Sequence, residues 1–193
     1  PSGGRTGLSA GAVAANGEIV VSMDKMNQIL EFFPADRMVR VQAGVVTEQL
    51  QNYAEEQGMY YPVDFASAGS SQIGGNIGTN AGGIKVIKYG MTRNWVLGLT
   101  VVTGKGDILR LNKGMIKNAT GYALQHLFIG GEGTLGLVTE AEIKEGEQYF
   151  HPIESITLVQ VSENLLPLHY PTETNEIYEK IEDGKYRLKY LEW

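Results

Sequence analysis

The chain has 193 residues, a net charge of −6 and a pI near 5.1, which suits one large domain or two small ones. This acidity argues against a nucleic-acid-binding surface, although backbone amides can hold a phosphorylated ligand without any basic patch. Because the chain contains no cysteine, it has no disulfide, thiolate metal site or cysteine nucleophile.

Hydrophobic patterning predicts the elements of the first 144 residues in chain order. Strands are predicted over residues 18–23 and 37–42, and a helix over 47–57, which Gly58 is placed to end. Residues 95–103 and 108–111 flank a Gly-Lys-Gly-Asp turn and predict a β-hairpin. A short helix over 122–129 and a strand over 137–143 complete this part of the chain.

After Lys144 the glycine-rich texture stops and prolines punctuate the chain. Here the pattern predicts a strand over residues 154–161, a short helix over 173–181 and a final strand over 185–193. We therefore divide the chain into residues 1–144 and a tail, residues 145–193, of uncertain role.

Three glycine-rich segments are the most informative feature of the sequence. The first run is residues 1–8, the second is 66–83 and the third is 130–136. Glycine weakens helices and strands, so such density predicts loops against which a large ligand lies closely. Ordinary turns and bulges are the alternative interpretation, but three runs with embedded Ser, Thr and Asn favour one extended ligand that several loops contact.

Other chemistry has weaker support. The third run contains G-x-G-x-x-G, but an alternating, strand-like segment follows it, whereas a dinucleotide fold requires a helix there. His126 is interpreted as a packed or half-buried residue, and His151 and His169 have no ligand-like spacing, so no metal site is predicted. No residue is predicted to be catalytic.

Several blocks in order resemble the FAD-binding family of the vanillyl-alcohol oxidase type, in the FAD-linked oxidase branch that includes D-lactate dehydrogenase, D-2-hydroxyglutarate dehydrogenase and glycolate oxidase. The first run resembles the family's first flavin loop. The second block is matched by Ser-Ser-Gln-Ile-Gly-Gly-Asn at 70–76, Thr-Asn-Ala-Gly-Gly at 79–83 and Lys-Tyr-Gly at 88–90. Residues 117–122 and 127–136 match the third block, so the resemblance covers residues 1 to about 144.

The resemblance implies an α+β fold of two subdomains with FAD between them, lacking the family's first strand and helix before Pro1. It implies non-covalent FAD, since Arg5 stands where tethered relatives often have His and the chain has no Cys. The first loop would wrap the pyrophosphate, the second block would follow the ribityl chain and flavin, and the third would approach the adenosine. The implied FAD-binding residues are Ser2, Gly3, Gly4, Arg5, Thr6, Gly7, Leu8, Gly69, Ser70, Ser71, Gly74, Gly75, Asn76, Gly78, Asn80, Gly82, Gly83, Tyr89, Glu132, Gly136 and Val138.

The implied function is the FAD-binding portion of an oxidoreductase that oxidises a D-2-hydroxy acid such as D-lactate, glycolate or D-2-hydroxyglutarate. The family's large substrate domain would follow Lys144, and the tail does not resemble it, so we expect no turnover from this chain alone. A non-catalytic flavin- or partner-binding module, and another enzyme on the same fold, are the alternatives. Ala10, Ala123 and Gly131 are mild departures from the family pattern.

Partners and location follow from the same interpretation. We expect a small hydroxy-acid substrate held by a missing domain, an unknown electron acceptor, no nucleic acid, and a homo-oligomer as one open state. No apolar run reaches membrane-spanning length, so we expect a cytoplasmic protein or one peripheral to the inner membrane. Because the sequence begins at Pro1, a preceding targeting segment stays open.

Overall fold

A computed structural model describes residues 1–147, 157–159, 178–182 and 185–188. The chain forms two compact units, Pro1–Gln148 and Tyr149–Trp193. The elements of the first unit are β1 (Ile29–Phe33), β2 (Met38–Gln42), α1 (Thr47–Glu56), β3 (Met59–Tyr60), α2 (Ile73–Thr79), α3 (Val86–Tyr89), the 3₁₀ helix η1 (Thr92–Asn94), β4 (Val96–Thr103), β5 (Ile108–Leu111), α4 (Gln125–Phe128), β6 (Gly136–Lys144) and β7 (Gly146–Glu147).

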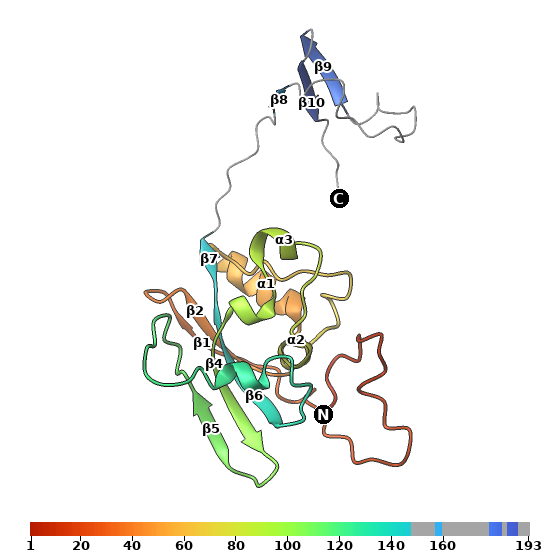
Figure 1. Ribbon diagram of the computed structural model, residues 1–193, viewed down its shortest axis with the longest axis vertical. Helices are drawn as coiled ribbons and strands as arrows, with labels where there is room; N and C mark the ends of the chain where they lie inside the picture. Colours follow the sequence, from red (N-terminus) through yellow and green to blue (C-terminus); the bar gives the residue numbers. More distant parts are fainter. Residues whose placement is uncertain (148–156, 160–177, 183–184, 189–193) are drawn as a thin grey trace. The chain divides into compact units, whose positions relative to one another are not determined.

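A five-stranded antiparallel sheet in the order β1-β2-β6-β4-β5 organises the first unit (Figure 1). Alternate residues of its strands, such as Val39, Val41 and Ile143, are fully buried. Leu50 of α1 and Ile77 of α2 belong to the same apolar core, so both helices pack on this face of the sheet. The mixture of helices and antiparallel strands confirms the predicted α+β class.

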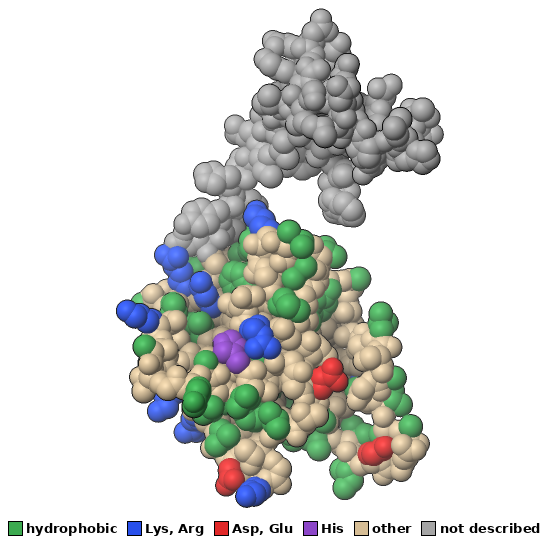
Figure 2. All heavy atoms as spheres, in the orientation of Figure 1, with side chains coloured by type: hydrophobic (Ala, Val, Ile, Leu, Met, Phe, Trp, Pro, Cys, Tyr) green, Lys and Arg blue, Asp and Glu red, His purple; other side chains and the backbone are tan. Residues whose placement is uncertain are grey.

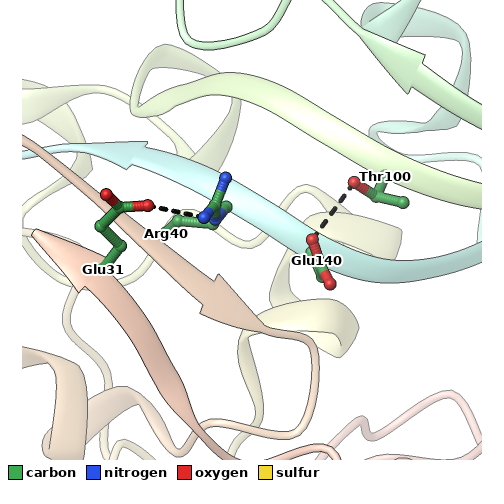
Figure 3. A network of polar contacts seen from close by, with 4 residues as sticks. All are labelled: Glu31, Arg40, Thr100 and Glu140. Carbon is green, nitrogen blue, oxygen red and sulfur yellow. Dashed lines mark hydrogen bonds and ion pairs between the residues drawn. The ribbon is translucent and has the colours of Figure 1, made fainter.

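The opposite face of the sheet is polar (Figure 3). Arg40 of β2 forms an ion pair with Glu31 of β1 at 2.6 Å, and Thr100 of β4 donates to Glu140 of β6 at 3.4 Å. Both side chains of the ion pair are substantially exposed, so it contributes at most about 1 kcal/mol. The sheet is therefore stabilised mainly by its apolar face.

Helix α1 confirms its prediction almost residue for residue. Its buried stripe includes Leu50 and Ala54, and Gly58, at φ 70°, adopts the left-handed conformation just after the helix ends. The hairpin β4–β5 and the strands β2 and β6 also confirm their predictions. Helix α4 confirms the helix predicted over 122–129, but with fewer residues.

The strand predicted over residues 18–23 was wrong, and one strand was missed. Residues 18–23 form no strand, because the segment makes a single β-bridge, from Ser22 to Ser2, and Ile19 is almost fully exposed. Strand β1 was not predicted, although the turn after Phe33 pairs it directly with β2.

The second unit contains β8 (Thr157–Val159), β9 (Tyr178–Glu182) and β10 (Lys185–Leu188), which form an antiparallel sheet in the order β8-β10-β9. The helix predicted over 173–181 was wrong for residues 178–181, which pair as a strand with β10; residues 173–177 lie outside the described residues. Strands β8 and β10 confirm the described parts of the strands predicted over 154–161 and 185–193.

Candidate functional site

The three glycine runs meet at one cavity of the first unit. The cavity has a volume of about 680 Å³, within the range of about 300–1,000 Å³ that is usual for small-molecule and cofactor sites. Its wall is formed by the N-terminal loop, by α2 and by the segment that leads into β6. Figure 1 shows the N-terminal loop, in red, beside α2 and the start of β6. The structure thus brings together segments that are far apart in the sequence.

Backbone hydrogen bonds hold the first run at Ser2, and the amides of the next residues have no acceptor in the described part of the chain. The Ser2 amide donates to the Val21 carbonyl at 2.9 Å, and the Ser2 carbonyl accepts from the Met23 amide at 3.0 Å. The amides of residues 3–7, in contrast, donate to no other described residue. Buried or half-buried amides are normally paired, so a free row on a cavity wall suits an anionic group such as phosphate.

Gly4 lets the first run lie against the second. A Cβ at this position would lie 2.0 Å from the Ser70 carbonyl oxygen, so only glycine fits between the two backbones. Arg5 follows with φ 56°, a left-handed conformation that costs free energy in a residue with a side chain. Such strain is commonly found at ligand-binding sites.

The second run contains the helix α2, whereas the glycine density predicted a loop. Ile73 and Ile77, one turn apart, are fully buried, and their burial outweighs the poor helix propensity of the intervening residues. A Cβ on Gly74 would lie 2.7 Å from the Ala43 Cβ, while a Cβ on Gly75 would meet nothing within 4 Å. Gly74 therefore permits packing inside the protein, and Gly75 leaves the cavity open.

The asparagines of the second run have structural partners. The Asn76 side-chain amide donates to Thr47 Oγ1 at 2.7 Å, and that hydroxyl pairs with Ser71 Oγ at 2.7 Å inside the protein. Asn80 ends α2 at φ 50° and accepts from the Arg93 amide at 3.0 Å. The sequence suggested that both asparagines would serve the cofactor; in the structure the Asn76 amide group donates to, and the Asn80 side-chain oxygen accepts from, neighbouring protein groups.

The third run is attached to the end of α2. The Gly130 amide donates to the Ile77 carbonyl and the Glu132 amide to the Gly78 carbonyl, each at 2.9 Å. Glu132 has φ 48° and lies on the cavity wall, as do Gly136 and Val138. Strand β6 follows this run, so the helix that a dinucleotide-type G-x-G-x-x-G motif requires is absent there.

Most of the predicted FAD-binding residues lie on the cavity wall, and their contacts with FAD stay predictions. On the wall are Ser2, Gly3, Gly4, Arg5, Thr6, Gly7, Gly74, Gly75, Asn76, Gly78, Gly83, Glu132, Gly136 and Val138. Described residues that were predicted but do not line it are Leu8, Gly69, Ser70, Ser71, Asn80, Gly82 and Tyr89. Ser70 still contacts the first run, and the Tyr89 carbonyl accepts from the Trp95 indole at 3.0 Å.

The cavity wall also contains residues that sequence reasoning missed: Pro1, Ser9, Ala10, Gly11, Ala12, Val13, Met23, Ala43, Phe65, Ser67, Gln72, Thr79, Ala81, Phe128, Gly133 and Leu137. Gln72 and Gly133 lie inside glycine runs, so taking every residue of each run would have found them, and extending the first run would have found Ser9 to Val13. Met23, Ala43 and Phe65 carry no local signal, because only the tertiary fold brings them to the cavity.

Arg5 and Glu132 are the titratable side chains of described residues that line the cavity, and His126 does not line it. His126 is exposed rather than half-buried, and its Nδ1 lies 3.3 Å from Arg93 Nη1. Figure 2 shows a purple histidine side chain beside a blue basic one on the face drawn. Partial burial and the neighbouring guanidinium lower the pKa of His126. Within the described residues no group of three His, Cys, Asp or Glu side chains could hold a metal, and His151 and His169 lie outside them.

No helix among the described residues is long and apolar enough to cross a membrane.

The fold and the cavity define a class: an α+β domain with an antiparallel sheet whose glycine-rich wall suits a long ligand that carries phosphate. Residues 1–112 match the family model described as "FAD binding domain". The chain belongs to this FAD-binding family.

Named relatives narrow the comparison. The chain is 76% identical over 144 residues to a D-2-hydroxyglutarate dehydrogenase of Stutzerimonas stutzeri (strain A1501), a match that covers 75% of this chain and 31% of the relative. It is 44% identical over 144 residues to a D-lactate dehydrogenase of Anaerostipes hadrus, covering 75% of this chain and 30% of that protein. The chain thus spans about a third of the length of the relatives it matches.

Solved structures show the same fold. A structure of alkyldihydroxyacetonephosphate synthase is similar with a TM-score of 0.65 and 29% sequence identity, covering 76% of this chain and 28% of that one. This similarity confirms the predicted fold type.

Proposed function

We propose that the chain is the FAD-binding portion of a flavin-dependent oxidoreductase that oxidises a D-2-hydroxy acid. The free amides of residues 3–7 on the wall that the other two glycine runs complete are the observation that carries the cofactor assignment. High identity to proteins named D-2-hydroxyglutarate dehydrogenase supports the substrate class, with D-lactate and glycolate as its other members.

The chemistry of the cavity wall suits this cofactor. Backbone amides of Gly4, Thr6 and Gly7 would hold the pyrophosphate, and Gly75, which has open space where a Cβ would stand, would let the flavin or ribityl chain approach α2. Glu132 and Val138 would lie toward the adenosine. Bound FAD supplies an acceptor for a hydride. The residues of this chain bind and orient it; the general base that takes the hydroxyl proton is proposed to come from another part of the enzyme.

Further parts of this proposal concern domains, partners and location. The FAD-binding domain is proposed to comprise residues 1–144, a length that agrees with the 144 residues aligned with the first relatives, and residues 145–193 are proposed to have a separate role. A substrate domain would hold the hydroxy acid, an unidentified acceptor would reoxidise the flavin, and the protein would form a homo-oligomer.

We propose a cytoplasmic location for the protein. Because the cattle relative is named mitochondrial, targeting to an organelle is the competing proposal. Cell fractionation decides between the two locations.

FAD is proposed to bind without a covalent link. Arg5 occupies the first run where a histidine tether would be needed, and the chain has no cysteine. Precipitating the loaded protein with acid should release yellow flavin to the supernatant. Flavin that stays in the pellet would refute this part of the proposal.

Titration of the full chain with FAD tests the central part of the proposal, with the flavin fluorescence followed to saturation. One FAD per chain is expected, and no change in fluorescence would refute it. Anaerobic mixing of the loaded protein with D-2-hydroxyglutarate or D-lactate tests the tail: we expect no bleaching from this chain alone. Bleaching that saturates with substrate would show that residues 145–193 complete an active site.

A further inference from the structure

Gln72 has a side chain whose orientation is fixed by Asp24. Its Nε2 donates to Asp24 Oδ1 at 2.9 Å. Hydrogen bonds from the Ser22 and Gln72 side chains, and more weakly the nearby Arg5, lower the pKa of Asp24, so the carboxylate is ionised at neutral pH and only accepts. The Gln72 amide must therefore turn its NH₂ group to Asp24 and its Oε1 atom the other way.

Gln72 Oε1 then lies against the first run without a partner. The atom is buried and accepts no hydrogen bond in the part of the chain that the structure describes. A Cβ on Gly3 would be 3.0 Å from it, so the oxygen lies next to the first run at Gly3. The Gly3 amide donates to no other described residue. A buried acceptor without a donor is costly, so a hydrogen bond from the Gly3 amide to Gln72 Oε1 would stabilise this side of the cavity.

We propose that the Asp24–Gln72 pair is a positioning element for the first run: it presents Gln72 Oε1 to the loop backbone and so sets the loop's remaining amides for a pyrophosphate. The inference rests on the proposed function and goes beyond it, because Gln72 was predicted only as part of a segment along the ribityl chain and flavin, and Asp24 was not predicted to act at the site at all. The two residues, Asp24 and Gln72, are 48 positions apart in the sequence and meet only in the folded protein.

The sign of one substitution separates positioning from simple electrostatics. Asp24 is a carboxylate near Arg5 and near the loop assigned to the pyrophosphate. If it acted only through its charge, removing it would free Arg5 and strengthen the binding of an anion. If it positions Gln72, removing it lets the amide rotate and weakens binding. The two roles predict opposite changes.

The test uses the 193-residue chain and three ligands: FAD, ADP, which carries the pyrophosphate, and riboflavin, which carries no phosphate. Asp24→Ala and Gln72→Met should each raise the Kd for FAD and ADP about tenfold, the effect of losing one hydrogen bond to a charged group, and leave the Kd for riboflavin unchanged. Asp24→Asn, whose side-chain oxygen still accepts from Gln72, should stay within about threefold of the unchanged protein.

Gln51→Met is the matched control, because its Nε2 donates to the Val63 carbonyl at 2.9 Å away from the cavity wall. It should leave all three affinities unchanged. Asp24 is exposed, so its variants keep the core, which circular dichroism verifies. If the unchanged chain binds no FAD, the proposed function falls and this inference with it. If it binds FAD but Asp24→Ala binds ADP as tightly or more tightly, the positioning inference alone is refuted.

Discussion

Gly74 and Gly75 are neighbours in α2, and the structure predicts opposite effects when each is given a side chain. A methyl group on Gly75 enters open space on the cavity side, and replacing a helical glycine by alanine adds up to about 1 kcal/mol of stability. A methyl group on Gly74 would stand 2.7 Å from the Ala43 Cβ, and such overpacking costs about 1–3 kcal/mol. The propensity gain offsets only part of that cost.

Urea unfolding of each variant measures its stability, and FAD titration measures its affinity for the cofactor, so the two effects are determined separately. Gly74→Ala should lose up to about 2 kcal/mol of unfolding free energy, the net of about 1–3 kcal/mol for overpacking and about 1 kcal/mol gained in helix propensity. Gly75→Val should keep its stability within about 1 kcal/mol. The same Gly75→Val variant should raise the Kd for FAD at least about tenfold, because the branched side chain occupies space that the cofactor needs. FAD affinity that is unchanged in Gly75→Val would refute the placement of the cofactor against α2.

Three further predictions concern the wall and the end of the sheet. Gly83→Ala should cost about 2–4 kcal/mol of unfolding free energy in urea, because Gly83 has φ 81° and a Cβ there would lie 2.0 Å from the Asp64 carbonyl oxygen. Asn76→Leu should cost about 1–3 kcal/mol in the same assay, since it leaves the buried Thr47 hydroxyl short of a donor; an unchanged midpoint would contradict the network. Burial raises the pKa of Glu145 from 4.5 to about 7, so the folded state binds this proton more tightly than the unfolded state does. The free energy of unfolding should therefore fall as the pH rises from about 4.5 to 7. Glu145→Gln should remove that part of the pH dependence, and an unaltered slope in the variant would refute the prediction.

Elements with a strong local pattern were predictable from the sequence. Helix α1 has a regular buried stripe and a glycine to end it, and the β4–β5 hairpin surrounds a recognisable turn. The glycine runs also predicted that several distant segments share one ligand site, and the structure brings residues of all three runs to one cavity wall. The ordered blocks of the family resemblance gave the cofactor and the fold type.

Features that depend on distant partners were not predictable. Residues 18–23 have the composition of a strand but no neighbouring strand to pair with beyond one bridge at Ser22. Helix α2 forms despite its glycines because Ile73 and Ile77 fill the core, which no local propensity shows. Gln72 and Asp24 pair across 48 positions, so sequence spacing gave no reason to connect them.

The central claim is that the three glycine runs hold one FAD molecule together. Hydrogen–deuterium exchange of the full chain with and without saturating FAD tests it most directly. The account predicts slower exchange in residues 1–13, 72–83 and 130–138 at the same FAD concentration, and unchanged exchange in the β4–β5 hairpin, which lies away from the cavity wall. Protection confined to one run, or absent from the amides of residues 3–7, would contradict it.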